Sequence, residues 1–467
     1  MIYQDEKGDI TMALTGDALI TRRMSVFKEK RFMDVVQLLR GADVAFTNAE
    51  VTFHNYEVPP TLTPGGGYMA AHPQMAKELQ WMGINIVACA NNHSYDFGEA
   101  GILATINNLD AVGLVHAGTG RNLAEARMPA YLETNNGRVA LISACSSGPP
   151  GMLAGEQWRD TIGRPGVNAI RSVTVQYVDN TTFNILRTLN ERIRTASSDY
   201  LTRVHYARRP PKVWGDIGLE DTASQFYMVD FRPWSQYPEP GGVMIAQGNN
   251  FERRLLPYKE DIEGNLQRIR EARRMAGWVI VTMHDHDEGK TPDDPSDVAV
   301  SFGKAAVDEG ADVFVVHGPH RDRGIEIYKG RPILYSLGHL IHQSDTVLRM
   351  PRDNMIRSGL GWEATTPDFF DNRAGREDIG EFKGMAAEPF RWRNAIALLE
   401  FLKGKLTAIR LYPIDLGFKR RRFQRGRPVM AEGEEAQEVL ELFKRTSAAF
   451  GTKVEISDGV GLIKVNS

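Results

Sequence analysis

Residues 87–98 of this chain read Val-Ala-Cys-Ala-Asn-Asn-His-Ser-Tyr-Asp-Phe-Gly. The apolar run from Ile84 to Ala90 follows a turn glycine and lacks polar alternation, so it predicts a buried strand. After that strand come the carboxamide of Asn92, the imidazole of His93 and the carboxylate of Asp96. Metal centres and general acids are built from such groups, and sites in α/β proteins form where strands end. Taken alone, an asparagine-rich turn with a capping aspartate explains the stretch equally well.

Four further predicted strands end in polar groups of the same kind. They are Asp17 after the strand 10–15, Asn48 and Glu50 after 42–47, His284 and His286 after 278–283, and His317 and His320 after 312–316. Seven of the eleven histidines fall in these clusters or in a turn expected at 338–342. A lone histidine at a strand end is usually structural, but five such clusters are hard to obtain by accident. We therefore expect one shared site.

The region that contains these clusters alternates strands with helical patterns. Apolar residues recur at helical spacing over 30–40, 73–81, 99–109 and 298–309, and 259–275 reads as a charged helix. The order strand, turn, helix, strand is typical of βαβ units with largely parallel strands. The Asn-Gly pair at 136–137 predicts a hairpin. The fold class is therefore α/β.

The pattern changes after residue 145. Residues 146–247 are rich in Gly, Pro, Arg and Trp, and we interpret them as an insertion that covers the site. The catalytic core is then formed by 1–145 and 248–345, and 346–467 is a C-terminal extension packed on it. Within the extension we expect a low-order stretch at 363–388, a strand pair at 395–402 and 405–412, a solvated edge strand at 419–427 and a helix at 434–447.

The net charge, the cysteine count and the distribution of apolar residues exclude several classes of function. A formal net charge of −3 gives no general attraction to nucleic acid or to an anionic membrane, so neither is expected as a partner. The two cysteines, Cys89 and Cys145, lie in apolar runs and predict no disulfide framework. The first nine residues are polar and acidic, and no stretch approaches the length of a membrane span. The expected location is the cytoplasm.

The residue types at the strand ends indicate metal chemistry. Imidazole and carboxylate groups without thiolate suit Zn²⁺, Mn²⁺, Fe or Ni. A carboxylate can bridge two ions, and such ions make a bound water acidic enough to attack a substrate at neutral pH. Asn92 adds a neutral oxygen ligand, and His93 beside it could protonate a leaving group. We predict a binuclear site that holds two divalent ions of Mn, Zn or Fe.

The motifs follow one another in a recognisable order. They are Gly16-Asp17 with Arg22, Asn48-Ala49-Glu50, Ala90-Asn91-Asn92-His93-Ser94-Tyr95-Asp96-Phe97-Gly98, His284 with Glu288, Pro319-His320 and Tyr335-Ser336-Leu337-Gly338. This order resembles the CapA family of capsule and poly-γ-glutamate synthesis proteins, which is related to calcineurin-like metallophosphatases. The resemblance covers residues 10–145 and 277–342, and the Asn-Asn-His-x-x-Asp element is its most specific part.

The resemblance implies a four-layer αββα metallophosphatase-like sandwich with a large insertion and a C-terminal extension. It implies that the metal ligands are Asp17, Glu50, Asn92, His284 and His320, with Glu50 as the bridge. His93 would then be the acid or the group that stabilises an oxyanion, and Asp96 is a catalytic candidate beside it.

This chain departs from the family pattern in three motifs. The usual His-Pro-His is Gly318-Pro319-His320 here, and His317, one residue earlier, becomes a candidate metal ligand. His-Trp-Gly is replaced by His284-Asp285-His286, and Ser-Leu-Gly-Asn is replaced by Ser336-Leu337-Gly338-His339. The extra histidines, His286 and His339, could restore a ligand or act as acid/base groups, which makes His286 a further catalytic candidate. The candidate substrate contacts are Arg22, Glu288 and His339, and Arg208 and Arg209 could also hold a carboxylate or phosphate.

The expected function is a soluble metal-dependent hydrolase that cleaves an ester or an amide bond, peptide-like or γ-glutamyl, in a small or peptide-like substrate. Three alternatives stay open: a non-catalytic accessory protein of capsule or poly-γ-glutamate synthesis, a metal-assisted peptide epimerase, and a phosphoesterase. The sequence does not specify whether the chain forms a homo-oligomer.

Overall fold

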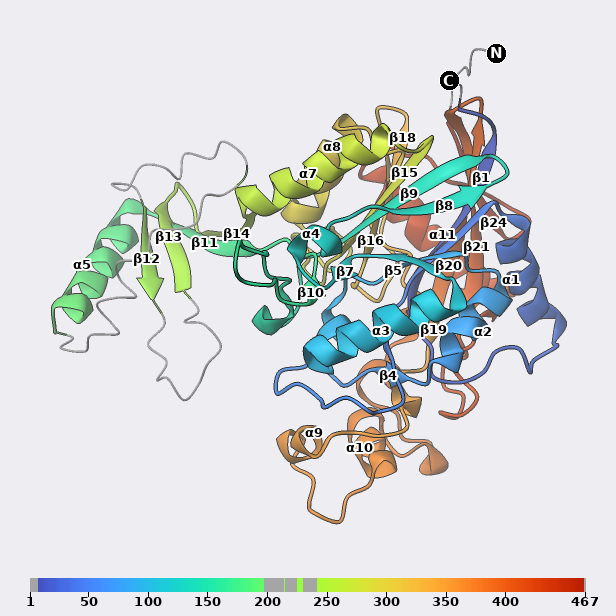
Figure 1. The fold of residues 1–467 in the computed structure, drawn as a ribbon, viewed down its shortest axis with the longest axis horizontal. Helices are drawn as coiled ribbons and strands as arrows, with labels where there is room; N and C mark the ends of the chain where they lie inside the picture. Colours follow the sequence, from blue (N-terminus) through green and yellow to red (C-terminus); the bar gives the residue numbers. More distant parts are fainter. Residues whose placement is uncertain (1–6, 197–213, 215–224, 230–241, 466–467) are drawn as a thin grey trace. The chain divides into compact units, whose positions relative to one another are not determined.

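The computed structural model describes residues 7–196, 214, 225–229 and 242–465 (Figure 1). Contacts divide the chain into two compact units. The first comprises Met1–Ala169, Leu266–Pro295 and Gly303–Ser467, and the second comprises Ile170–Asn265 and Ser296–Phe302. The first quarter of the expected insertion, residues 146–169, therefore belongs to the first unit together with the predicted site. Arg208 and Arg209 lie outside the described residues.

The first unit contains a large mixed sheet built on β1 (Ile10–Leu19). On one side of β1 run the parallel strands β2 (Val44–Asn48), β5 (Ile86–Ala88) and β6 (Val115–Ala117). On its other side run the antiparallel strands β20 (Arg393–Leu402), β21 (Lys405–Asp415), β24 (Val460–Lys464) and β23 (Glu455–Ser457), and β22 (Val429–Met430) pairs with β21. The C-terminal strands thus extend the sheet itself.

The strand β19 (His339–His342) takes over from β20 at the carboxyl end of β1. β20 pairs with Ile10–Leu14, whereas β19 pairs in parallel with Asp17–Leu19. The turn expected at 338–342 was wrong, because these residues complete the sheet beside the predicted ligand Asp17.

A second sheet of the first unit has the strand order β17-β18-β16-β15-β9-β8. Its strands are β8 (Ala130–Thr134), β9 (Gly137–Cys145), β15 (Trp278–His284), β16 (Val313–His317), β17 (Ile325–Tyr328) and β18 (Arg331–Leu334). β9, β15, β16 and β18 are parallel, and β8 and β17 form antiparallel edges. The β8–β9 connection is the hairpin that the Asn-Gly pair predicted.

The two sheets pack face to face because alternate residues of each strand are apolar. Met12, Leu14 and Phe46 enter a core shared with Leu141 and Ile280 of the second sheet. The residues that alternate with these in the first sheet, such as Ala13 and Ala45, lie on its opposite face. That face packs against the helices α1 (Lys30–Gly41), α2 (Gln74–Met82) and α3 (Gly98–Val112). The helices α7 (Lys259–Arg273) and α8 (Asp297–Asp308) run along the second sheet (Figure 1). The layers are αββα, which confirms the predicted fold class.

The remaining elements of the first unit are short, apart from one helix. They are β3 (Thr52–Phe53), β4 (Ala70–Ala71), β7 (Thr119–Gly120), β10 (Gly166–Val167), α4 (Leu123–Ala126), α9 (Arg352–Arg357), α10 (Thr366–Ala374) and the longer α11 (Gly433–Ala448). Of the second unit, the structure describes β11 (Ser172–Val178), β12 (Gln225–Val229), β13 (Gly242–Gln247), β14 (Glu252–Pro257) and α5 (Asn180–Ala196), with the strands in the order β12-β13-β11-β14.

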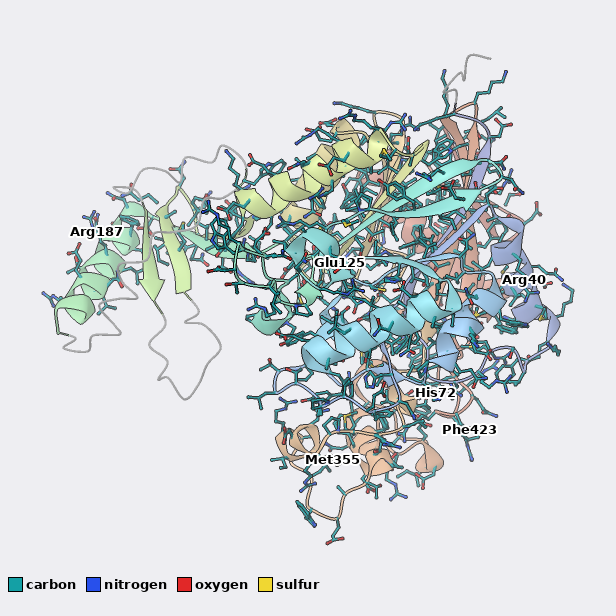
Figure 2. The ribbon with its side chains drawn as sticks, viewed as in Figure 1. Arg40, His72, Glu125, Arg187, Met355 and Phe423 are labelled. Carbon is teal, nitrogen blue, oxygen red and sulfur yellow. The ribbon has the colours of Figure 1, made fainter. Side chains whose placement is uncertain are left out.

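Two predictions for the C-terminal extension were wrong. The stretch 363–388 contains α10 and short 3₁₀ turns, and α10 starts with a capping box between Thr365 and Asp368. The basic run 419–427 forms turns instead of a strand. Its Arg425 is 1% exposed and pairs with Asp345 and Glu377, whereas Phe423 is exposed (Figure 2). Buried carboxylates distant in sequence fix this run, so local composition could not reveal it.

Gly16→Ala is expected to lower the free energy of unfolding by about 1–3 kcal/mol, as overpacked sites do. An added Cβ would overlap the carbonyl oxygen of Gly338, which accepts a hydrogen bond from the backbone N–H of Asp17 at 2.9 Å. Urea-induced unfolding measures the change. Gly361→Ala, where nothing lies within 4 Å of an added Cβ, is the matched control. Equal unfolding midpoints for the two variants would contradict the close approach of β1 and residue 338.

Candidate metal centre

The stretch that follows β5 is held in place by Asn91. This residue starts the 3₁₀ turn Asn92–Tyr95 with a capping box that includes Ser94. Its Nδ2 donates to Oδ1 of Asn48 at 3.2 Å and to the carbonyl oxygen of Ala49 at 2.9 Å. The amide of Asn91 thus ties the end of β5 to the end of β2, and the two side chains that follow it are positioned by both strands.

His93 and Asp96 form a buried pair. The imidazole Nδ1 lies 2.6 Å from Oδ2 of Asp96. The carboxylate also accepts hydrogen bonds from the backbone N–H groups of Gly65 at 2.9 Å and Met69 at 2.7 Å. Because the Asp96 carboxylate accepts from these two N–H groups and lies against the His93 ring, it favours the tautomer in which Nδ1 of His93 carries the proton. The other nitrogen, Nε2, lies 3.9 Å from Oε1 of Glu50.

Asp17 and Glu50 are the two fully buried carboxylates of the cluster. Asp17 accepts hydrogen bonds from Nδ2 of Asn48 at 2.8 Å and from the backbone N–H of Gly318 at 3.2 Å. Neither oxygen of Glu50 has a hydrogen-bond partner among the described residues. An ionised carboxylate buried without a partner is unfavourable by several kcal/mol, so the environment of Glu50 favours either a proton on the carboxyl group or a cation beside it.

Histidines of the second sheet and of β19 face these carboxylates. β15 and β16 pair in register so that His284 lies beside His317, and β1 and β19 pair so that Asp17 lies beside His339. The register explains why residues far apart in the sequence meet. Nε2 of His284 is 3.7 Å and Nε2 of His320 is 3.9 Å from Oε1 of Glu50.

Asp17 is surrounded by imidazoles in the same way. Its carboxylate lies 3.4 Å from Nδ1 of His320, 3.8 Å from Nδ1 of His284 and 4.0 Å from Nδ1 of His317. His320 has a left-handed backbone with φ 55°, an uncommon conformation for a residue with a side chain. This backbone lets its ring reach Asp17 and Glu50 together.

The spacings fit shared metal ligands better than hydrogen bonds. Two ligand atoms about 2.1 Å from one ion at a tetrahedral angle lie about 3.4 Å apart, close to the separations of 3.4–4.0 Å in this cluster. Two groups of three residues place their ligand atoms within 4.8 Å of one another: Asp17, His320 and His339, and Glu50, His286 and His320. His320 belongs to both groups, and each group has the donor types and spacing that could hold a divalent ion.

Unpaired lone pairs support the same conclusion. Among the described residues, the buried atoms without a hydrogen-bond partner include both oxygens of Glu50, Oδ1 of Asn92, both ring nitrogens of His317, Nδ1 of His320 and Nε2 of His339. Buried polar atoms are almost always satisfied, and all of these atoms are of the types that bind metals. The donor set therefore fits divalent cations.

The charges of the cluster are consistent with this donor set. Burial raises the pKa of Glu50 well above its ordinary value, and the charges of Asp17 and Asp96 raise it further. For Asp17, burial raises the pKa, but the close contact with His320 and the charges of the neighbouring imidazoles bring it well below the ordinary value. A divalent cation would favour the ionised form of both carboxylates.

Residues around the cluster orient its imidazoles. Nδ1 of His339 lies 3.2 Å from the carbonyl oxygen of Arg391, which leaves Nε2 of His339 towards the cluster. The rings of His320, His339, His342 and Trp392 stack in sequence, with centroid separations of 4.6, 4.2 and 4.5 Å. Such second partners fix the orientation of metal-binding histidines.

The predicted site residues fall into three groups. The structure brings Asp17, Glu50, His93, His284, His317 and His320 together, and it leaves Oδ1 of Asn92 unpaired while Nδ2 donates to Gly65 at 2.6 Å. His286 and His339 were expected as a catalytic residue and a substrate contact or as restored ligands, and both lie in groups that could hold a metal. Glu288 is exposed in the loop after β15. The guanidinium of Arg22 donates to the backbone carbonyls of Phe423 and Arg425, which is a structural contact.

Several residues of the site were missed by the sequence reasoning. Asp285 accepts a hydrogen bond from the hydroxyl of Ser146 at 2.7 Å, and the hydroxyl of Ser147 accepts from the backbone N–H of His286 at 2.8 Å. This network holds the His284–His286 strand end. The position of Asp285 between two candidate histidines was the available signal, whereas the roles of Ser146 and Ser147 depend on the pairing of β9 with β15.

The architecture and the donor set define a class. An αββα sandwich with carboxylates and imidazoles gathered at the strand ends of both sheets is a metallophosphatase-like fold. The family model "Bacterial capsule synthesis protein PGA_cap" matches residues 8–344, so the chain belongs to this family of bacterial capsule synthesis proteins.

Individual proteins with similar sequences match different shares of this chain. An uncharacterized protein of Sinorhizobium fredii, y4sH, is 31% identical over 97% of this chain and 93% of its own length. A probable polyglutamine synthesis accessory protein of Mycobacterium tuberculosis is 26% identical over 58% of this chain and 48% of its own length. The capsule biosynthesis protein CapA of Bacillus anthracis is 21% identical over 72% of this chain and 60% of its length.

A solved structure of the NAD nucleotidase (NadN) of Haemophilus influenzae aligns with a TM-score of 0.32 and 9% identity, over 94% of this chain and 57% of that protein. A likeness at this level supports no statement about function. Within the described ranges of the chain, no helix combines the length and the apolar composition needed to cross a bilayer.

Protein purified without chelator is expected to contain divalent metal, and Glu50→Gln and His320→Ala are expected to lose most of it. Elemental analysis of the purified proteins measures the content. Because an ion that binds only the folded state stabilises it, chelator should also lower the melting temperature of the wild type more than that of either variant. His116→Ala removes an imidazole that pairs with Asp110 and is the control. Full metal content in both ligand variants would rule out this ligand set.

In chelated protein, stability should fall as the pH is lowered from about 6.5 to about 4. Burial lowers the pKa of His317 to about 4, against a smaller opposing effect of Asp17. The unfolded chain therefore binds a proton in this window that the folded imidazole does not, which favours unfolding. Urea unfolding of chelated wild type and His317→Gln at about pH 7.5 and about pH 5 checks this. The variant should lose less stability, and identical losses would argue against a neutral buried His317.

Proposed function

We propose that the protein is a metal-dependent hydrolase that cleaves an amide bond, peptide-like or γ-glutamyl, or an ester bond. The observation that carries the proposal is the buried Glu50 carboxylate, which has no hydrogen-bond partner among the described residues and has three imidazoles within 3.9 Å. Asp17, Glu50, Asn92, His284, His286, His317, His320 and His339 would hold the ions. Divalent ions in such a site polarise a carbonyl or phosphoryl group and make water more acidic.

His93 is the group best placed to move a proton. Its Nδ1 is bound to Asp96, which fixes the ring, while Nε2 faces the cluster beside Glu50. A proton on Nε2 could pass to the nitrogen or oxygen of a leaving group, which is general acid catalysis. Asp96 acts through His93 and is a positioning residue. The arrangement resembles other nucleophile-and-acid sites in which a carboxylate holds the working histidine.

A second candidate is an accessory protein that binds polymer or partner proteins without turnover. It is favoured by the relatives, which include a probable polyglutamine synthesis accessory protein of Mycobacterium tuberculosis. The two candidates differ in one result. A hydrolase releases new amine or alcohol ends from a γ-glutamyl or ester substrate in a metal-dependent manner, whereas an accessory protein leaves every substrate intact.

His93→Asn should lower kcat by about 10²–10⁴, the usual contribution of a general acid or base, and should retain its metal. Asp96→Asn should lower kcat by a smaller factor because it loosens the ring without removing it. Release of free amine from γ-linked glutamate oligomers, measured on metal-loaded protein, gives the rates, and elemental analysis gives the metal content. Unchanged kcat in His93→Asn would remove it from the mechanism. Absence of turnover in the wild type with every amide and ester tested would favour the accessory role.

A further inference from the structure

The rim of the metal cluster carries arginines from the C-terminal segment, which lies beyond the part matched by the family model. Arg391 precedes Trp392 of the ring stack, and its carbonyl holds His339. The carbonyl contact to His339 at 3.2 Å places Arg391 at the edge of the cluster. Its positive charge also contributes to the lowered pKa of His286, His320, His339 and His342, for which burial is the largest cause.

Packing fixes the direction of Arg391. Its guanidinium lies 5.2 Å from the centre of the Phe390 ring, and the guanidinium of Arg321 lies 4.7 Å from the centre of the same ring. Arg321 is neutralised by Asp293 at 2.5 Å. Nε of Arg391 pairs with Glu388, whose side chain is 41% exposed, so this pair is screened by water and weak.

Arg373 lies on the other side of the rim. Its guanidinium interacts electrostatically with Arg391 and Asp345, and it lines a small cavity with His342 and Trp392. Asp345 is bound by the buried Arg425. Within the described chain, Arg373 forms no ion pair, and the residue is exposed. Its charge is therefore available to an incoming anion.

A glycine loop contacts both Asn92 and Arg373. The carbonyl oxygen of Gly65 accepts from Nδ2 of Asn92 at 2.6 Å. Two residues later, a Cβ added at Gly67 would lie 3.1 Å from Nη1 of Arg373. Arg373 therefore lies against the same short loop that holds the candidate ligand Asn92, and glycine at position 67 leaves room for its guanidinium.

We propose that Arg373 and Arg391 form an anion subsite at the rim of the metal cluster, which selects substrates that carry a carboxylate or phosphate beside the bond to be cleaved. The inference rests on the proposed function, and it adds a substrate class to it. Guanidinium groups bind carboxylates and phosphates through paired, charge-assisted hydrogen bonds. A chain of γ-linked glutamates offers such a carboxylate on every unit.

Calorimetric titration of the full-length, metal-loaded protein tests the proposal with three probes. The first is a γ-linked glutamate tetramer, the second is the same tetramer with its free carboxylates converted to amides, and the third is inorganic phosphate. Arg373→Met and Arg391→Met should each weaken binding of an anionic probe by about tenfold, the equivalent of one charge-assisted contact. Arg373→Lys should fall between wild type and Arg373→Met, because it keeps the charge and loses the paired geometry.

Arg376→Met is the matched control, because Arg376 lies on the same segment and pairs with the exposed Asp378. It should change binding less than twofold, within the range of surface substitutions. Arginine-dependent binding of the acidic tetramer identifies the anion as a carboxylate, and arginine-dependent binding of phosphate alone identifies a phosphate ester. Equal binding of the acidic and amidated tetramers, unchanged binding in both methionine variants, or no binding of any probe to the wild type would overturn the subsite.

Metal content of every variant separates this subsite from a structural role. Arg373→Met and Arg391→Met should retain the wild-type content, because neither side chain is a ligand. A variant that loses metal together with binding would overturn the subsite and assign its arginine to the support of the histidines. Arginine-dependent binding without any turnover would leave the subsite standing and would contradict only the hydrolase.

Discussion

The structure buries carboxylate oxygens and imidazole nitrogens, which all carry lone pairs, against one another. Asp17 and Glu50 are removed from water in the first sheet, and imidazole nitrogens of the second sheet and of β19 surround them at 3.4–4.0 Å. Lone pairs that face one another repel, and desolvated carboxylates are unfavourable. A cation bound among these groups would turn the mutual repulsion of their lone pairs into favourable ligand contacts. The αββα sandwich supplies the rigidity that keeps the donors in place without it.

Rigidity comes from two sheets that meet at the same end. β1, β2 and β5 deliver Asp17, Glu50 and the Asn92–Asp96 turn, and β15 and β16 deliver His284, His317 and His320. Parallel pairing brings consecutive strand ends to one edge, and the apolar core between the sheets fixes their separation. The Asn91 and Asn48 amides then join neighbouring strand ends directly. The positions of the site residues are therefore set mainly by the register of the strands that precede them.

Local patterns in the sequence were sufficient for the α/β class and for the composition of the site, whereas the two-sheet αββα layering followed from the family resemblance alone. Short apolar runs that end in Asn, His or Asp are visible without knowledge of pairing. The roles of individual histidines were less predictable. His339 and His286 reach the ligand positions through the pairing of β19 with β1 and through the Ser146–Asp285 network, and pairings across hundreds of residues leave no local signature. Arg425 shows the same limit, since its partners Asp345 and Glu377 make a basic run structural.

The exchange of partners along β1 has a consequence for biosynthesis. β20 pairs with the first half of β1 and β19 pairs with the second half, although more than three hundred residues separate both strands from β1 in the sequence. A nascent polypeptide on the ribosome therefore carries Asp17 and Glu50 long before their sheet can close. Folding with such high contact order is slow, and the cluster around Asp17 and Glu50 can form only after nearly the whole chain has been synthesised. Closure of the cluster is thereby coupled to completion of the polypeptide, because a product truncated before β19 lacks His339 and leaves the second half of β1 without its partner strand.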